Sequence, residues 1–214
     1  KNLAISSGIK KQLIQLGIAE NKIKVIFNPV KRHQQTIKSN QELKYKQIGY
    51  VGRIMFEGQK NIKELLDAVK LLSPGSIKVH FFGSGEVEIC KRYIEEHNIQ
   101  QDFYWHGWTS KPWERMENLD VLMQTSKFEG FPMVLLESLS YGLPVIAANC
   151  PTGPEDIVNK ENGYLYSLGD TEELARIIDN YDRNHFNSKR VKESISKFYI
   201  DDYIKELCKA IEVE

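Results

Sequence analysis

The sequence predicts a doubly wound α/β domain, in which helices cover both faces of a parallel sheet. Strand-like and helix-like apolar patterns alternate along residues 45–185. The strand-like runs are short and continuously apolar, which is typical of parallel strands that are buried on both faces. A length of 214 residues leaves room for this domain and for smaller pieces beside it.

The first half of the domain contains strand-like runs with helical patterns between them. From Ile62 to Leu72, apolar residues recur at the spacing of one helix face. Pro112 fits the first turn of a short helix, where its missing N–H costs no hydrogen bond. In chain order we expect a strand at 46–53, a helix at 61–72, a strand at 77–83, a helix at 86–98, a strand at 102–107 and a short helix at 112–118.

The second half continues the same alternation. Pro132 again fits the first turn of a helix, and this helix is apolar around much of its girth. We expect a strand at 120–125, a helix at 132–141, a strand at 144–149, a helical turn at 153–158, a strand at 162–167, a helix at 171–182 and two further helical stretches at 187–197 and 200–212.

The segments on either side of this domain have a different organisation. Residues 1–44 are expected to form a strand "NLAIS", a helix "SGIKKQLIQLG" and a strand "KIKVIFNPV" (22–30), followed by a polar linker. Residues 186–214 are expected to form C-terminal helices. The last helix carries an apolar stripe that includes Ile204, Leu207 and Ile211, so we expect it to pack against another surface. Because the chain does not begin with Met, we expect it to be part of a longer protein.

Composition excludes several classes of function. Basic and acidic residues both number 29, so net charge favours neither nucleic acid nor an acidic membrane as a partner. The three cysteines are widely spaced and form no CxxC pair, which argues against a zinc site or a disulfide framework and favours the reducing cytoplasm. No apolar run approaches the roughly 20 residues of a membrane span. The first residues lack the layout of a signal peptide.

Ligands of open α/β sheets bind at the carboxyl ends of the strands, and candidate residues follow the first two strands. Arg53 and Lys60 follow the first, where they would suit a phosphate or remain solvated surface cations. Gly83 and Gly85 follow the second. Because Glu88 stands where a dinucleotide fingerprint needs a third glycine, an NAD-type site is disfavoured, and either a close ligand approach or a tight turn explains the glycines.

Aromatic residues follow the third strand. Trp108 and Trp113 would either stack on a nucleobase or pack in the core and its rim. His106 lies at the end of the same strand, and by itself it indicates little.

Two carboxylates flank the start of the helix that follows the fourth strand. The free N–H groups of Met133 and Val134 would attract a phosphate at this terminus. A carboxylate is a poor neighbour for a phosphate, so Glu129 and Glu137 need another partner, and a pair of vicinal hydroxyls fits one of them. The alternative for Glu137 is an exposed helix position, which its apolar neighbours make less suitable.

These motifs together resemble a known family. The stretches "EGFPMVLLE", "SYGLPVIAANCPTGPEDIV", "NGYLY" and "YVGRIMFEGQKNIKELLDAV" are similar to the C-terminal half of a family 4 glycosyltransferase of the GT-B fold, over residues 3–185. Three shorter stretches, "FEGQKN", "HGW" and "CPTGPEDIV", look closest to bacterial lipopolysaccharide 1,6-galactosyltransferases and related exopolysaccharide enzymes.

The resemblance implies an enzyme with two Rossmann-like domains and an active site between them. Residues 45–185 would be the nucleotide-sugar-binding domain, and residues 1–44 a remnant of the N-terminal domain plus the linker. The reaction would be the retaining transfer of a hexose, galactose from UDP-galactose being the narrower expectation, without a metal or other cofactor. The acceptor, a lipopolysaccharide or another cell-surface polysaccharide, would bind through the N-terminal domain. The enzyme would be cytoplasmic, with peripheral association at the inner membrane.

The resemblance also implies roles for individual residues. Arg53 and Lys60 would hold the diphosphate and act in catalysis with Glu129, which would contact the transferred sugar, while Glu137 would bind the ribose diol. Further donor contacts would come from Gly52, His106, Trp108, Gly130, Phe131, Pro132, Met133 and Val134. One departure is that the Arg-to-Lys spacing is a residue longer than in many relatives and that Asn61 replaces the usual glycine.

Two other functions remain open from the sequence. A nucleotide-sugar epimerase of the GT-B architecture would share the sheet and the diphosphate site, and it would need His106 and Glu129 as acid–base groups. A non-catalytic nucleotide-binding or interaction module would use the same fold without chemistry.

Overall fold

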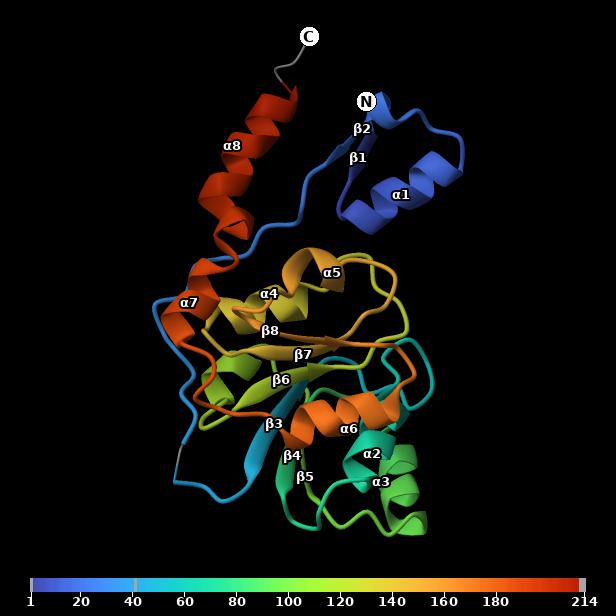
Figure 1. Ribbon diagram of the computed structural model, residues 1–214, viewed down its shortest axis with the longest axis vertical. Coiled ribbons are helices and arrows are strands. Elements are labelled where there is room, and N and C mark those ends of the chain that lie inside the picture. Colours follow the sequence, from blue (N-terminus) through green and yellow to red (C-terminus); the bar gives the residue numbers. More distant parts are fainter. Residues whose placement is uncertain (1, 41, 212–214) are drawn as a thin grey trace.

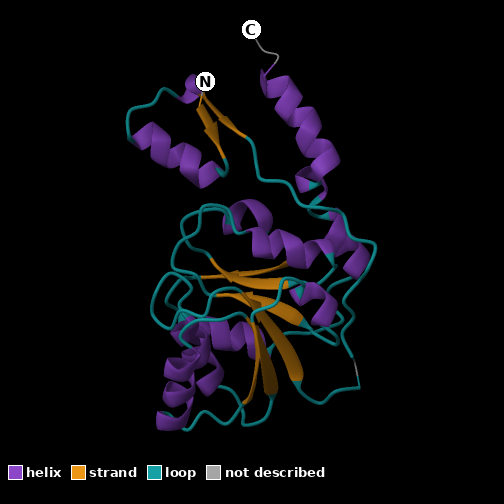
Figure 2. Ribbon diagram, turned by 180° about the vertical axis from the view of Figure 1, so that it is seen from behind, coloured by secondary structure: helices purple, strands orange, loops and turns teal. Residues whose placement is uncertain are grey.

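A computed structural model describes residues 2–40 and 42–211. Its centre is a six-stranded parallel sheet in the order β5-β4-β3-β6-β7-β8, with helices on both faces (Figures 1 and 2). The doubly wound α/β fold predicted from the sequence is therefore confirmed. The strands of this sheet are β3 Lys46–Val51, β4 Ile77–Phe82, β5 Asp102–Gly107, β6 Val121–Gln124, β7 Val145–Ala148 and β8 Gly163–Tyr166.

The helices form one layer on each side of the sheet (Figure 1). One layer consists of α2 Ile62–Lys70, α3 Val87–Glu96 and α6 Thr171–Asp179. The other consists of α4 Met133–Ser140, α5 Pro154–Ile157 and α7 Ser188–Glu193. Successive residues of strand β6 pack beneath opposite helix layers. Val121 and Met123 belong to the core beneath the first layer, and Leu122 belongs to the core beneath the second. This is why the strand carries no polar–apolar alternation in its first three residues.

The order of the strands reverses between β3 and β6. From β3 the chain moves outward through β4 and β5, and from β6 it moves outward in the opposite direction through β7 and β8. The loops at the carboxyl ends of β3 and β6 therefore leave the sheet side by side and in opposite directions. In open α/β sheets this switch point is the usual place for a ligand crevice.

A small unit precedes the sheet domain. It contains β1 Asn2–Ala4, α1 Ser7–Gln15, the 3-10 turn η1 Glu20–Lys22 and β2 Ile23–Val25, and its two strands form a separate parallel pair. It lies beside α5 (Figure 1), where Ser6 Oγ donates to Thr152 Oγ1 at 3.1 Å and the Ser7 amide donates to the Asp156 carboxylate at 2.8 Å.

The predicted linker is held along the domain surface. Lys192 Nζ donates to the backbone carbonyls of His33 and Gln35, at 3.1 and 2.7 Å, and to Thr36 Oγ1 at 2.8 Å. Ile37 is only 4% exposed. Although this stretch is polar in composition, it is not a free linker, because Lys192 on α7 donates hydrogen bonds to it.

The C-terminal helices close the described chain. A 3-10 turn, η3 Ser196–Phe198, connects α7 to α8 Ile200–Ile211, which extends away from the sheet (Figure 1). The stripe expected on α8 is largely open, since Ile204 is 52% exposed and Cys208 is also exposed. The predicted end of this helix at residue 212 lies outside the described residues. None of the helices described is both long and apolar enough to cross a membrane.

Two predicted elements differ from the structure. The strand expected from the pattern "KIKVIFNPV" pairs only over Ile23–Val25, because its single neighbour, β1, is three residues long. The short helix expected at 112–118 is a 3-10 turn, η2, over Pro112–Arg115.

Candidate functional site

The loops that follow β3 and β6 are fastened to each other at the switch point. Thr125 Oγ1 donates to the carbonyl of Lys60 at 3.0 Å, and the Lys127 amide donates to the carbonyl of Gln59 at 2.8 Å. In return, Gln59 Nε2 donates to the carbonyl of Phe128 at 3.0 Å. The two loops therefore form one wall of the crevice, although about seventy residues separate them in the chain.

An ion pair connects these loops. Lys60 Nζ lies 2.6 Å from Glu129 Oε1, and their side chains are 24% and 10% exposed. The Glu129 backbone is fixed as well: its amide donates to the Pro151 carbonyl, and its carbonyl accepts from the amide and hydroxyl of Thr152. Two predicted residues are thus brought into direct contact in a partly buried place, where a charged pair interacts more strongly than on the surface.

Asn61 follows Lys60 at the position where the family resemblance implies a glycine. Asn61 adopts the left-handed conformation, with φ of 49°, and it precedes the first residue of α2. Glycine favours this region, and among other residues Asn tolerates it well. Its side-chain amide bonds to the carboxylate of Glu64. The departure noted in the sequence therefore keeps the turn that a glycine would make.

A pocket lies at the carboxyl ends of β3, β4 and β5. Its volume is about 290 Å³, and its lining contains three of the predicted residues, Gly52, Arg53 and Trp108. The indole of Trp108 is 73% exposed. The remaining lining residues are Val51, Phe82, Gly83, Ser84 and Thr109.

The glycines after β4 serve a close approach between two loops. A side chain at Gly83 would overlap the carbonyl oxygen of Gly52, and one at Gly85 would overlap that of Ile54. The amide of Ile54 donates to the carbonyl of Ser84 at 2.9 Å. The sequence left open a close ligand approach or a tight turn, and the structure shows a different reason for the glycines, a close backbone approach within the protein. Of the residues in this approach, Gly52 and Gly83 line the pocket.

Helix α4 begins beside the same crevice. Pro132 precedes Met133, the first helical residue, and no side chain caps this terminus. The first amides of a helix, here those of Met133 and Val134, have no partner within the helix. Gly130 leads into this terminus, and Phe131 is buried beneath it in the core under α4. The geometry required for the predicted anion site is present.

Glu137 lies farther along α4 and has a different partner from Glu129. Trp113 Nε1 donates to Glu137 Oε2 at 3.2 Å. Burial raises the pKa of Glu137, and the indole hydrogen bond opposes this effect in part. Trp113 itself is 8% exposed and stacks on Tyr141, which confirms the packing role considered for it. Among the described residues, no hydrogen bond or ion pair links the two carboxylates, since Glu129 pairs with Lys60 and Glu137 bonds to Trp113.

His106 lies on β5 and is part of a hydrogen-bonded row rather than of the pocket lining. Its Nε2 is 3.1 Å from His80 Nδ1, and His80 Nε2 is 2.9 Å from Gln47 Oε1. The ring also stacks on Phe82, which does line the pocket. Burial lowers the pKa of both histidines, that of His80 to about 4. His106 is therefore an exposed residue of the edge strand, which contacts Phe82 of the pocket lining but is not itself part of that lining.

Two residues near the ion pair were not singled out from the sequence. Gln124 Nε2 lies 3.5 Å from Glu129 Oε1, and Thr152 Oγ1 donates to the carbonyls of Glu129 and Gly130, both at 3.0 Å. A polar residue that ends the buried strand "VLMQ" is a signal that sequence reasoning could have used. No pattern indicates Thr152, because its contacts come from loops that meet only in the fold.

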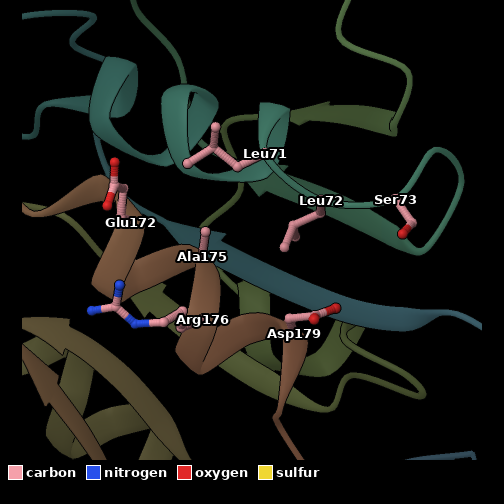
Figure 3. A pocket seen from close by; sticks show the side chains of 7 residues that line it. All are labelled: Leu71, Leu72, Ser73, Glu172, Ala175, Arg176 and Asp179. Atoms are coloured by element: carbon pink, nitrogen blue, oxygen red, sulfur yellow. The ribbon is translucent and has the colours of Figure 1, made fainter.

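Other features lie outside this site. A hollow of about 410 Å³ lies between the end of α2 and α6, and it contains none of the predicted residues (Figure 3). Among residues 2–40 and 42–211, no cluster of three or more His, Cys, Asp or Glu side chains is arranged to hold a metal ion.

Comparison with known proteins gives consistent matches. A family model described as "Glycosyl transferases group 1" matches residues 31–198. The lipopolysaccharide 1,6-galactosyltransferase of Escherichia coli K12 is 42% identical over 98% of this chain and 60% of its own length. The structure of the lipopolysaccharide outer core galactosyltransferase WaaB in its apo form matches with a TM-score of 0.89 and 37% identity, over 98% of this chain and 60% of that one.

More distant structures share the fold. Anabaena Alr3699/HepE in complex with UDP-glucose matches with a TM-score of 0.80 at 20% identity, over 98% of this chain and 62% of that one. The chain thus spans about 60% of the length of the relatives that it matches.

Proposed function

The chain belongs to the group 1 glycosyltransferase family, and from this premise we propose that it forms the donor-binding part of an enzyme that transfers a hexose from a UDP-sugar. The GT-B fold and the family expected from the sequence are confirmed by the family match and by the structural match. The observation that carries the proposal is the Lys60–Glu129 pair, which joins the loops after β3 and β6 at the switch point of the sheet, and the first of these loops also supplies Arg53 to a pocket.

The charges of the site support the proposed division of roles. Arg53 and Lys60 would bind the donor diphosphate, together with the amides at the start of α4. As the bond to the sugar breaks, negative charge develops on the diphosphate, and these groups would stabilise it. No metal ion would then be required for leaving-group stabilisation. Glu129 would accept hydrogen bonds from hydroxyls of the transferred sugar, and Glu137 from the ribose diol.

The similar proteins support UDP-galactose as the donor and a lipopolysaccharide as the acceptor. Two relatives, from Escherichia coli and Salmonella typhimurium, are lipopolysaccharide 1,6-galactosyltransferases, and HepE was solved with UDP-glucose. We further propose that the acceptor contacts a part of the enzyme other than the pocket described above. Transfer would retain the configuration of the sugar, as the family resemblance implies.

The contacts of the site do not favour an epimerase. That reaction would need His106 and Glu129 as mobile acid–base groups at one sugar. Instead, His106 contacts His80 and does not line the pocket, and Glu129 is paired with Lys60.

The test is calorimetric titration of the 214-residue chain with UDP and with UDP-galactose. We expect binding of both, with little turnover by the chain alone. Failure to bind UDP at millimolar concentration would rule out the proposed donor site. Product analysis in the absence of acceptor tests the alternative, since an epimerised nucleotide sugar would indicate an epimerase.

We also propose that the complete enzyme works at the cytoplasmic face of the inner membrane, as a peripheral protein. Support comes from the distribution of charge along the chain. Residues 1–46 contain ten basic and two acidic residues, although the whole chain is neutral. Such a basic segment is attracted to anionic lipid headgroups.

A further inference from the structure

Gln124 is an unusual residue for the end of a buried strand. All four residues of β6 are buried, and Gln124 is 3% exposed. Its Oε1 is buried and accepts no hydrogen bond from any residue in the described part of the chain. Leaving a buried amide oxygen without a partner costs free energy, and an apolar side chain of similar size would avoid that cost. A benefit other than stability is therefore needed to explain the glutamine.

The other end of the amide points to that benefit. Gln124 Nε2 lies 3.5 Å from Glu129 Oε1, and Lys60 Nζ contacts the same oxygen at 2.6 Å. An ionised carboxylate only accepts hydrogen bonds, so the N–H side of the amide must face it. At 3.5 Å the amide contact is long, and it orients the carboxylate rather than binding it tightly.

The second oxygen of Glu129 has a different environment. Both side-chain donors described for Glu129 contact Oε1, and no residue of the described chain donates to Oε2. The backbone of Glu129 is fixed by Pro151 and Thr152, so only rotation of the side chain remains to be set. With Oε1 held by two donors, Oε2 is the oxygen available to a ligand hydroxyl.

No second anion competes for the amide. The Gln124 side chain also has a hydrogen-bond contact with the thiol of Cys150, which is 4% exposed. Burial, with a contribution from the charge of Glu129, raises the pKa of Cys150 to about 11, so the thiol stays neutral near pH 7.

We propose that Gln124 is a positioning residue, which holds Glu129 so that Oε2 faces the hydroxyls of the donor sugar. This inference rests on the proposed function of the site. It predicts that Gln124 matters for the sugar of the donor and not for the nucleotide, because Glu129 and not the phosphate-binding groups depends on it.

The decisive variant is Gln124→Leu, which removes the orienting donor together with the unpaired oxygen. For the 214-residue chain we expect an unchanged or higher Tm, since the buried oxygen without a partner is removed and only the long 3.5 Å contact with Glu129 is lost. Calorimetry should show UDP binding within about twofold of the wild-type chain and UDP-galactose binding weakened by about 3- to 10-fold, the range of one oriented hydrogen bond.

A matched control is the same substitution at a glutamine with satisfied hydrogen bonds. Gln101 is also buried, but its amide donates to the carbonyls of Val69, Leu72 and Ser73, and its oxygen accepts from the Ile77 amide. Gln101→Leu should lower Tm and leave the ratio of the UDP and UDP-galactose dissociation constants as in the wild-type chain.

The outcomes separate the inference from its premise. If Gln124→Leu lowers Tm and weakens both ligands equally, the residue is structural and the inference is overturned. Unchanged UDP-galactose binding would overturn it as well. If the wild-type chain binds no UDP, the proposed donor site fails first, and the inference fails with it.

Discussion

Individual side chains at the switch point carry most of the proposed chemistry, and Arg53 offers the most direct test. It is exposed and lines the pocket at the carboxyl ends of β3, β4 and β5, where a guanidinium can bind two phosphate oxygens. Arg53→Ala should weaken UDP binding by about 1.5–3 kcal/mol, the worth of a charged hydrogen bond. Calorimetry at two salt concentrations measures this. Arg92→Ala, at another exposed arginine, is the control, and equal effects of the two variants would remove Arg53 from the site.

We expect the ionised Glu137 carboxylate to lower the free energy of unfolding at neutral pH and to contribute to UDP binding. Burial raises the pKa of Glu137, so the native state holds this proton more tightly than the unfolded chain does. The free energy of unfolding therefore falls as pH rises from about 4, the pKa of an unperturbed Glu, through the raised native pKa. Glu137→Gln should be more stable than the wild-type chain at pH 7, by roughly 0.5–2 kcal/mol, and should bind UDP more weakly.

Urea unfolding of the Glu137→Gln and wild-type chains between pH 4 and 7 checks the pH dependence, since the difference between them should shrink toward the acidic end. A constant difference over this range would show that Glu137 ionises in the native state as it does in the unfolded chain.

The sequence identified the residues of the site more fully than their partners. Residue type and place after a strand were enough to select Arg53, Lys60 and Glu129. The Glu137–Trp113 bond and the Gln124 contact could not be derived in the same way, because they depend on which loops meet across the sheet. His106 shows the same limit, since the tautomer and direction of its ring follow from His80.

At the scale of elements, glycines allow the backbones of the loops after β3 and β4 to pack directly against each other. Gly83→Ala would drive a methyl group into the carbonyl of Gly52. It should lower the free energy of unfolding by about 3 kcal/mol or more, because neither backbone segment can move freely. Gly75→Ala is the control: Gly75 has φ of 67° but open space around it, so only the conformational cost of about 1–2 kcal/mol applies. Similar losses in urea unfolding would show that the loops can separate.

The bounds of helices with a clear apolar pattern were predicted closely. The bounds of strands whose length depends on a neighbouring strand were not. The helix expected at 132–141 is α4, Met133–Ser140, since Pro132 and Gly142 mark its ends. The strand expected at 22–30 stops at Val25 instead, because strand length depends on the partner. The order of the strands in the sheet could not be predicted from the sequence, because strands and helices alternate along the chain in the same way wherever the strand order reverses.

At the scale of the whole molecule, charge is unevenly distributed although its sum is zero. Lys10, Lys11, Lys22 and Lys24 lie in the N-terminal unit, at the end of the molecule where α8 also extends (Figure 1), and Lys31 and Arg32 follow this unit. The remaining described basic residues of segment 1–46, Lys38, Lys44 and Lys46, lie farther along the linker and at the start of β3. The rest of the chain carries an equal excess of negative charge. Overall composition, which first argued against an acidic surface as partner, therefore conceals a local excess.

This distribution of charge predicts that the chain binds anionic membranes. The chain should sediment with vesicles of phosphatidylglycerol and phosphatidylcholine at low salt, and not with phosphatidylcholine alone, because each basic residue near an anionic surface contributes about 1 kcal/mol. About 0.5 M salt should release it, since screening then acts within a few ångströms. Charge reversal at Lys22 and Lys31, both exposed, should weaken binding, whereas reversal at Lys91 and Lys189, on α3 and α7, should not. Equal losses from the two pairs would mean that net charge alone drives binding, and the basic segment would then have no role as a membrane-facing surface.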